Sequence, residues 1–353
     1  MSVTGARPGA DPGAGARETL NTRETKGGTG MAKADILMTG QMSAAVIEQL
    51  SAAATVHRLW EAGDKAALLR EIGPRIRGIA TSGGHGPTDA ALFDLLPNLE
   101  IVSSFGVGYD NVDAAEAARR GIVVTNTPDV LNEEVADLTI GLLLATIRKL
   151  PQADRYLRDG KWLQGHFPLS ATLRDRTVGI LGLGRIGKAI ARRIEAFGVP
   201  IHYHTRTRQP DVPYPYHPTP VSLAEAVDVV IVIIPGGAAT RHIVNAEVLK
   251  ALGPNGILIN VARGSVVDER ALIEALRSKT ILSAGLDVFE DEPRVPQELI
   301  DMEHVVLLPH LGSASVYTRN AMGQLVADNL ISWFSGKGPL TPVAETPWKG
   351  AAA

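Results

Sequence analysis

The sequence predicts an α/β protein made of two doubly wound domains, each built on a parallel sheet. Two observations favour this fold class. Short apolar runs alternate with amphipathic helical stretches through most of the 353 residues, and the alternation starts again after a long helical stretch near the middle. Parallel strands joined by crossover helices produce this pattern. We therefore expect a flavodoxin-like domain followed by a Rossmann domain.

The first predicted domain begins with the apolar run that follows residue 34. Each later run up to residue 126 is separated from the previous one by a stretch with helical periodicity, as expected for strands covered by helices on both faces. The predicted strands are 36–39, 56–59, 79–81, 101–104 and 122–124.

The second predicted domain repeats the alternation from residue 177 to residue 310. Its first strand, 177–181, is followed by a glycine-rich turn and by a helix predicted over 188–197. The remaining strands are predicted at 200–204, 229–234, 257–261, 284–288 and 305–308.

A long helical pattern lies between the two groups of strands. It covers 132–150, is broken by Pro151 and resumes to about residue 157. Its apolar residues occupy more of the helix surface than one narrow stripe needs. Two interpretations stay open: either the 132–157 region packs against a second copy in a homodimer, or the helix is buried within its own chain. The apolar residues concerned are Val135, Leu138, Leu142, Leu143 and Ile147.

The order of these elements predicts the domain boundaries. A helix predicted over 318–334 is long enough to return to the first domain, and residues from 340 onward are expected to form a loose tail. Residues 1–31 have hardly an apolar side chain, so we expect a disordered extension there. The resulting boundaries are 32–131 plus 320–345 for the first domain and 132–319 for the second.

Composition limits the possible partners and compartment. The chain has a net charge of -3, so we expect no basic surface that would bind nucleic acid or an anionic membrane. It contains no cysteine and no metal-binding spacing such as HExxH, so we expect no metal site. The longest apolar run, 138–147, is too short to span a bilayer. We predict a cytoplasmic protein with neither a nucleic-acid nor a membrane partner.

The turn after the first strand of the second domain carries the motif GxGxxG. Gly182, Gly184 and Gly187 occupy its glycine positions, and Arg185 and Ile186 lie between the last two. In a dinucleotide-binding turn the first glycine permits a tight bend, the second lets the backbone approach a pyrophosphate, and the third lets helix pack on strand. The flanking strand and helix supply the required context, so we predict cofactor binding here. A glycine-rich loop without a ligand is the alternative.

The end of the next strand indicates which cofactor binds. An NAD-binding unit usually has an acidic residue there, which accepts hydrogen bonds from ribose hydroxyls. This chain has Thr205, Arg206 and Arg208 instead. Guanidinium groups suit a ribose 2′-phosphate, which a carboxylate would repel. We therefore predict NADPH in preference to NADH, the alternative being a solvated loop with two ordinary surface arginines.

Polar residues follow three later strands, at the strand ends where open α/β sheets place their ligands. Arg263 follows 257–261, and His310 follows 305–308. Asp287, and then Glu292, follow the apolar residues 284–286. Each alone is more often an ordinary loop residue. Together, beside a dinucleotide-binding turn, they indicate a catalytic site.

Four stretches of the chain resemble the D-isomer-specific 2-hydroxyacid dehydrogenase family. They are the turn at 182–187, Asn-Val-Ala-Arg-Gly at 260–264, Gly-Leu-Asp-Val-Phe-Glu-Asp-Glu-Pro at 285–293 and Pro-His-Leu-Gly-Ser-Ala at 309–314. The resemblance extends over nearly all of 34–340. It implies a substrate-binding first domain and an NAD(P)-binding second domain.

The resemblance also implies residue roles. Arg263 orients a 2-keto acid, His310 is the acid/base, Glu292 is its carboxylate partner, and Asp287 lies near the nicotinamide amide. Val107 and Gly108 belong to a glycine-flanked turn whose amides could hold a carboxylate, and the resemblance implies that they bind the substrate carboxylate. Pro235, Ala262 and Gly312 complete the predicted cofactor contacts.

The chemistry of ketone reduction agrees with these roles. Hydride transfer to a ketone generates alkoxide character on oxygen, and histidine is a proton donor that is easily reloaded near neutral pH. A guanidinium can bind the substrate carboxylate or polarise the keto oxygen. We predict NADPH-dependent reduction of glyoxylate or hydroxypyruvate to the D-2-hydroxy acid. The alternatives are a hydroxyphenylpyruvate-type reductase and a dinucleotide-sensing, corepressor-like binding protein.

Overall fold

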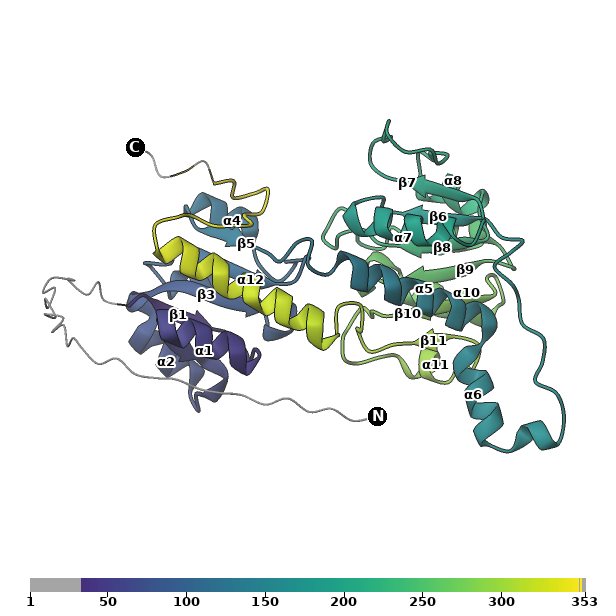
Figure 1. The fold of residues 1–353 in the computed structure, drawn as a ribbon, viewed down its shortest axis with the longest axis horizontal. Helices are drawn as coiled ribbons and strands as arrows, with labels where there is room; N and C mark the ends of the chain where they lie inside the picture. Colours follow the sequence, from purple (N-terminus) through teal and green to yellow (C-terminus); the bar gives the residue numbers. More distant parts are fainter. Residues whose placement is uncertain (1–32, 349, 351–353) are drawn as a thin grey trace, which may run out of the picture. The chain divides into compact units, whose positions relative to one another are not determined.

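The computed structural model describes residues 33–348 and residue 350 (Figure 1). The predicted extension at 1–31 lies outside the described residues. The described part contains two sheets, and every pairing between their named strands is parallel. This confirms the predicted fold class.

The first sheet has the strand order β2-β1-β3-β4-β5, which is the flavodoxin-like order. Its strands are β1 (Asp35–Met38), β2 (Thr55–Arg58), β3 (Ile76–Ser82), β4 (Ile101–Phe105) and β5 (Val123–Thr125). Its helices are α1 (Ala44–Ala53), α2 (Lys65–Ile72), α3 (Ala90–Asp94), α4 (Ala114–Arg119) and, from far along the chain, α12 (Val316–Phe334). Figure 1 shows α1 and α12 side by side, and α12 packs on β3 and β4.

The second sheet has the order β11-β10-β9-β8-β6-β7. Its strands are β6 (Val178–Leu181), β7 (Ile201–His204), β8 (Val229–Val232), β9 (Ile257–Asn260), β10 (Ser283–Leu286) and β11 (Val306–Leu307). The accompanying helices are α5 (Asn132–Arg148), α6 (Leu150–Arg158), α7 (Arg185–Glu195), α8 (Pro220–Glu225), α9 (Ala246–Leu252), α10 (Glu269–Arg277) and α11 (Gln297–Ile300). The order reverses between β6 and β8, which is where ligands bind in sheets of this kind.

Successive residues of each strand pack into different hydrophobic clusters, one on each face of the sheet. In β1, Ile36 and Met38 join the cluster under α1 and α12, whereas Leu37 joins the opposite cluster. In β8, Val229 and Val230 divide between two clusters in the same way. Both sheets are therefore buried on both faces, which explains why their strands read as short, almost continuous apolar runs.

The structure corrects the predicted helix boundaries in the middle of the chain. Helix α5 ends at Arg148, and Lys149 adopts a left-handed conformation with φ 54°. Pro151 lies in the first turn of α6 instead of breaking the helix itself. The break comes earlier because a proline ring would clash with the carbonyl of Ile147, four residues before it, in a continuous helix. Helix α7 also begins earlier than predicted, at Arg185, because Gly184 is its N-cap.

The prediction of a loose tail after residue 340 is wrong. The amide of Val343 donates to the Val124 carbonyl oxygen (2.9 Å), and the side chain of Val343 is buried in the first domain. Thr346 accepts a hydrogen bond from the Val124 amide (2.9 Å). This segment lies against the edge strand β5, and an unpaired edge is a place where another segment readily adds. The domain boundaries as a whole stay a prediction.

The remaining short elements are 3-10 turns. They cover Leu59–Glu61, Gly73–Arg75, Gly83–His85, Lys161–Leu163 and Gly264–Val266.

Candidate active site

The three motif glycines after β6 differ in what surrounds them. Gly182 has φ 110°, and a Cβ there would collide with the carbonyl oxygen of Ile233. A Cβ on Gly187 would collide with the carbonyl oxygen of Gly182. Gly184 has no other atom within 4 Å of the position of a Cβ. The first and third glycines thus permit close backbone packing, and the second faces open space that a pyrophosphate could occupy.

The helix that follows this turn has an uncapped N-terminus. No side chain caps the amide groups of its first turn, and no acidic residue lies there. The first amides of a helix lack partners within the helix and carry partial positive charge, so they favour an anion. Arg185 and Ile186 supply two of these amides, and the Arg185 guanidinium lies 3.4 Å from Asp129.

The segment after β7 presents cations and no carboxylate at the end of the strand. Thr205 is half-buried, and its hydroxyl donates to the Thr207 carbonyl oxygen (2.7 Å). Arg206 and Arg208 are exposed. Neither makes an ion pair with any described residue. Both guanidinium groups are therefore available to a phosphate, as the donor chemistry of NADPH binding requires.

Arg263 follows β9 and lies against the glycine turn of the first domain. Its Nε donates to a carboxylate oxygen of Asp110 (2.9 Å), and its Nη1 donates to the Ala262 carbonyl oxygen (2.8 Å). A Cβ on Gly108 would collide with Nη2 of Arg263. The structure thus brings together Arg263 and Gly108, two residues that sequence analysis placed in different domains.

The turn after β4 offers unpaired amides. Gly106 has φ 147°, and Thr127 binds this residue through both its hydroxyl and its amide. Asn126 donates to the Val107 carbonyl oxygen (2.8 Å). The amides of Val107 and Gly108 have no acceptor among the described residues. A rigid turn with two free N–H groups is suited to a carboxylate.

His310 and Glu292 form a close pair. The distance between His310 Nδ1 and Glu292 Oε2 is 2.7 Å, and both side chains are partly exposed. His310 adopts φ 54°, a left-handed conformation that costs a non-glycine residue roughly 1–2 kcal/mol. Strain of this kind at a polar residue is typical of functional sites.

Opposing effects act on the pKa of Glu292. Burial raises it, but the hydrogen bond and charge of His310, the Phe289 amide and the charge of Arg263 together outweigh burial. The pKa of Glu292 therefore lies below its ordinary value, so the carboxylate is charged at neutral pH. A charged carboxylate on Nδ1 fixes the orientation of the ring and leaves Nε2 free.

Asp287 is buried and holds the backbone that follows His310. Its carboxylate accepts hydrogen bonds from the amides of Leu311 (2.6 Å) and Gly312 (2.8 Å). Burial raises the pKa of Asp287, and these two hydrogen bonds oppose that rise. A Cβ on Gly312 would lie 3.2 Å from the same carboxylate, so this approach is tight. The predicted position of Asp287 near a nicotinamide amide stays a prediction.

The other predicted cofactor residues lie at the carboxyl ends of β8 and β9. Pro235 is exposed, and its carbonyl oxygen accepts from the Thr240 hydroxyl (2.7 Å). Ala262 is buried, and its amide donates to Asn260 (3.1 Å). The side chain of Asn260 also donates to the Arg263 carbonyl oxygen (3.0 Å). Asn260 therefore fixes the backbone of the segment that carries Arg263.

Two further residues belong to this site and were not predicted from the sequence. Asn260 was quoted only as part of a motif, and its buried position at the end of β9 was the signal that could have identified it. Asp110 lies two residues after Gly108, and no sequence pattern assigned it a role. Its contact with Arg263 joins residues 153 apart in sequence, which periodicity cannot reveal.

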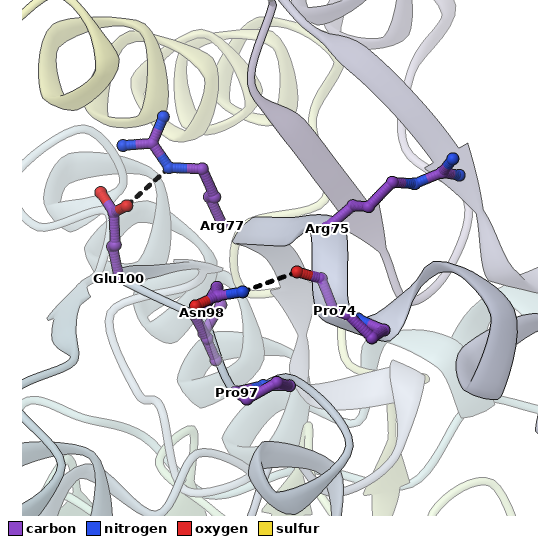
Figure 2. A pocket seen from close by; sticks show the side chains of 7 residues that line it. Pro74, Arg75, Arg77, Pro97, Asn98 and Glu100 are labelled. Atoms are coloured by element: carbon purple, nitrogen blue, oxygen red, sulfur yellow. Dashed lines mark hydrogen bonds and ion pairs between the residues drawn. The ribbon is translucent and has the colours of Figure 1, made fainter.

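One surface hollow of the described residues lies away from this site. It has a volume of about 410 Å³ and is lined by Pro74, Arg75, Arg77, Pro97, Asn98, Leu99 and Glu100. Figure 2 shows Arg77 paired with Glu100 and Asn98 with the Pro74 carbonyl oxygen, so its polar groups already have partners. It lies at the amino ends of β3 and β4, opposite the carboxyl ends at which ligands bind.

No metal centre was expected, and no group of three or more His, Cys, Asp or Glu side chains in the described residues has a metal-binding arrangement. His202 contacts His217, with 2.9 Å between ring nitrogens, and His204 contacts the His217 carbonyl oxygen. Among the same residues, no helix is both long and apolar enough to cross a membrane.

Comparison with known proteins gives consistent relatives. Residues 140–312 match the NAD binding domain of the D-isomer specific 2-hydroxyacid dehydrogenases. The chain is 51% identical to glyoxylate/hydroxypyruvate reductase A of Arabidopsis thaliana over 308 residues, which is 87% of this chain and 98% of the relative. It is 46% identical to hydroxyphenylpyruvate reductase of Plectranthus scutellarioides, over 87% of this chain and 98% of the relative.

A similar solved structure is that of the NADPH-dependent glyoxylate/hydroxypyruvate reductase of Sinorhizobium meliloti in complex with NADP and malonate. It is 57% identical in sequence, has a TM-score of 0.86, and the alignment covers 91% of this chain and 100% of that chain. The agreement extends over both sheets and is far above the identity at which only a fold is shared. The chain belongs to the D-isomer specific 2-hydroxyacid dehydrogenase family.

Proposed function

We propose that this protein is an NADPH-dependent reductase of small 2-keto acids, with glyoxylate or hydroxypyruvate as substrate and the D-2-hydroxy acid as product. The observation that carries the proposal is the placement of Arg263, Glu292 and His310. They follow β9, β10 and β11, which are neighbours in the sheet. The names of the relatives from Arabidopsis thaliana and Sinorhizobium meliloti support the same activity.

In this mechanism NADPH supplies the hydride. The amides of Val107 and Gly108 bind the substrate carboxylate, and the Arg263 guanidinium beside them polarises the keto oxygen. Nε2 of His310 donates the proton to that oxygen as negative charge develops on it. Glu292 stays charged and stabilises the positive ring through Nδ1. Domain closure about hinges near 127–132 and 312–320 would exclude water before reaction.

The choice of NADPH is supported by the segment after β7. Arg206 and Arg208 are exposed and make no ion pair with the described residues, and Thr205 brings no negative charge. The relative from Sinorhizobium meliloti is NADPH-dependent and was solved with NADP. Thr205→Asp combined with Arg206→Ala should move the preference toward NADH, measured as kcat/KM for each cofactor. Unchanged cofactor kinetics would remove this assignment.

We further propose a homodimer. The apolar residues Val135, Leu142, Leu143 and Ile147 of α5 are buried within the chain, so they no longer support a partner surface. Large apolar side chains in and after α6 support a partner surface instead. Those that are 51–98% exposed are Leu150, Leu157, Trp162, Leu163 and Leu169. Large exposed apolar side chains that recur within one short segment support an interaction surface there. A chain without cysteine forms no disulfide, so it gains no stability from an oxidising compartment, and we propose the cytoplasm as its location.

A substrate panel tests the proposal. Loss of NADPH absorbance should be fastest with glyoxylate or hydroxypyruvate and slower with pyruvate. Faster turnover of hydroxyphenylpyruvate would favour the second candidate, which the 46% identical relative from Plectranthus scutellarioides supports. Tight NADPH binding without turnover of any keto acid would contradict the proposed reductase activity and favour a dinucleotide-sensing protein.

A further inference from the structure

Residues 205–210, called the β7 loop below, are fixed at their C-terminal end by a buried tyrosine. The side chain of Tyr203 is completely buried. Its hydroxyl donates to the Gln209 carbonyl oxygen (3.2 Å) and accepts from the Gln209 amide (2.9 Å). One hydroxyl thereby satisfies both backbone groups of Gln209. The backbone of Gln209 is held against the sheet, although it lies outside any helix or strand.

The side chain of Gln209 connects the β7 loop to the glycine turn. Its Nε2 donates to the Leu183 carbonyl oxygen (2.8 Å). Leu183 lies between the first two motif glycines, so this hydrogen bond joins the predicted pyrophosphate turn to the loop with the two arginines. A connection between neutral groups in a partly buried place contributes about 1 kcal/mol and fixes a distance.

The N-terminal end of the β7 loop is also fixed. The Tyr216 hydroxyl donates to the Thr205 carbonyl oxygen (3.2 Å), and His204 Nδ1 donates to the His217 carbonyl oxygen (2.8 Å). Between the two fixed ends, Arg206 and Arg208 remain exposed and make no ion pair with the described residues. The loop therefore has a constrained backbone and two unengaged guanidinium groups.

We propose that Gln209 is a positioning residue for cofactor selectivity, and this inference rests on the NADPH dependence proposed above. In NADPH the 2′-phosphate and the pyrophosphate are linked covalently through one ribose. The arginines and the glycine turn must therefore lie at a matched spacing to bind both groups at once, and holding that spacing before binding reduces the entropic cost. Gln209 holds this spacing without touching either phosphate.

The test measures nucleotide binding by calorimetry, independently of turnover. Gln209→Leu removes the side-chain donor at similar size. We expect about a fivefold loss of affinity for 2′,5′-ADP, which corresponds to the ~1 kcal/mol of one net hydrogen bond, and less than about a twofold change for 5′-AMP. Tyr214→Phe is the matched control, since it removes a hydrogen bond to Glu195 (2.7 Å) from the same connecting segment but outside the β7 loop. Its preference for 2′,5′-ADP should equal that of the wild type.

The outcomes separate this inference from the proposed function. Wild-type protein that binds 2′,5′-ADP no more tightly than 5′-AMP overturns NADPH dependence, and this inference with it. Wild-type preference for 2′,5′-ADP that persists in folded Gln209→Leu overturns the role of Gln209 alone. Should that variant fail to fold, Tyr203→Phe removes the hydroxyl that holds the Gln209 backbone. Selective weakening of 2′,5′-ADP in Tyr203→Phe then supports the inference, and unchanged selectivity overturns it.

Discussion

The turn after β6 and the turn after β4 are both glycine-rich, but their glycines are required for different reasons. A Cβ on Gly182 or Gly187 would meet backbone carbonyl oxygens, which cannot move without shifting a strand or a helix. A Cβ on Gly108 would meet the end of the Arg263 side chain. Backbone packing therefore requires glycine at 182 and 187, whereas the space for the Arg263 side chain requires glycine at 108. Substitution of Gly187 should therefore reduce stability, and substitution of Gly108 should reduce turnover.

His310→Ala sets the reference for a loss that is purely chemical. It removes the proposed proton donor, whose contribution is typically 10²–10⁴-fold, so kcat should fall by about 10³. NADPH affinity and the unfolding midpoint should stay close to those of the wild type, since the side chain is partly exposed. Steady-state kinetics and fluorescence titration with NADPH check both. Weak NADPH binding together with normal kcat at saturation would contradict the role.

Gly108→Ala should also reduce turnover without reducing stability, but by a smaller factor than His310→Ala. The new methyl group displaces the Arg263 guanidinium, and a misplacement of about 1 Å can cost roughly 10²-fold in rate. We expect kcat/KM for the keto acid to fall by about that factor, with a change of less than about 1 kcal/mol in the free energy of unfolding. Gly63→Ala is the control, because no other atom lies within 4 Å of its Cβ position. Equal losses in both variants would break the comparison.

Gly187→Ala should show the opposite signature. Its methyl group meets the Gly182 carbonyl oxygen, so α7 must move away from the turn, which costs about 1–3 kcal/mol of folding free energy. Denaturant titration should detect this loss, and NADPH binding should weaken with it. At saturating NADPH, kcat should fall less than in Gly108→Ala. Full stability in this variant would show that the turn is not constrained by backbone packing.

The smallest expected effect is a change in the pH dependence of stability, and it comes from Tyr109, the residue that directly follows Gly108. Burial, the hydrogen bond to Glu345 and nearby negative charges raise the pKa of Tyr109 from 10.0 to about 12. The folded chain therefore keeps this proton where the unfolded chain loses it. The stabilising contribution is complete below pH 10 and is lost as the pH rises toward 12.

Tyr109→Phe removes this dependence. The stability advantage of the wild type over the variant should shrink as pH rises above 10, by less than about 1 kcal/mol because the group is partly exposed. Urea titrations at several alkaline pH values measure the difference. A difference independent of pH would contradict the contact with Glu345.

Sequence patterns predicted the strands well because both sheets are buried on both faces. Apolar runs such as that of β8, flanked by helical stretches, are typical of buried parallel strands. The ends of these predicted strands indicated Arg263 and His310 as candidate site residues. The motif glycines likewise revealed the turn after β6, where the first and third permit close backbone packing and the second leaves open space.

Contacts between distant residues could not be predicted in this way. Three such contacts depend on side-chain geometry that no local pattern encodes. They are the ion pair of Arg263 with Asp110, the hydrogen bonds that Asp287 accepts from two amides, and the hydrogen bond from Gln209 to Leu183. The tail after residue 340 was misjudged for the same reason. This segment has neither helix nor strand periodicity, and the burial of Val343 depends on its contacts with distant residues of the first domain.

The position of α12 has a consequence for biosynthesis. This helix covers β3 and β4, yet it is translated only after all strands of the other sheet. Until residues 316–346 leave the ribosome, one face of the first sheet is covered only in part, by α1, and its edge strand β5 lacks the segment that pairs with it. The second sheet can therefore finish folding before the first, and the apolar surface of the first sheet that stays exposed until then makes the nascent chain prone to aggregation.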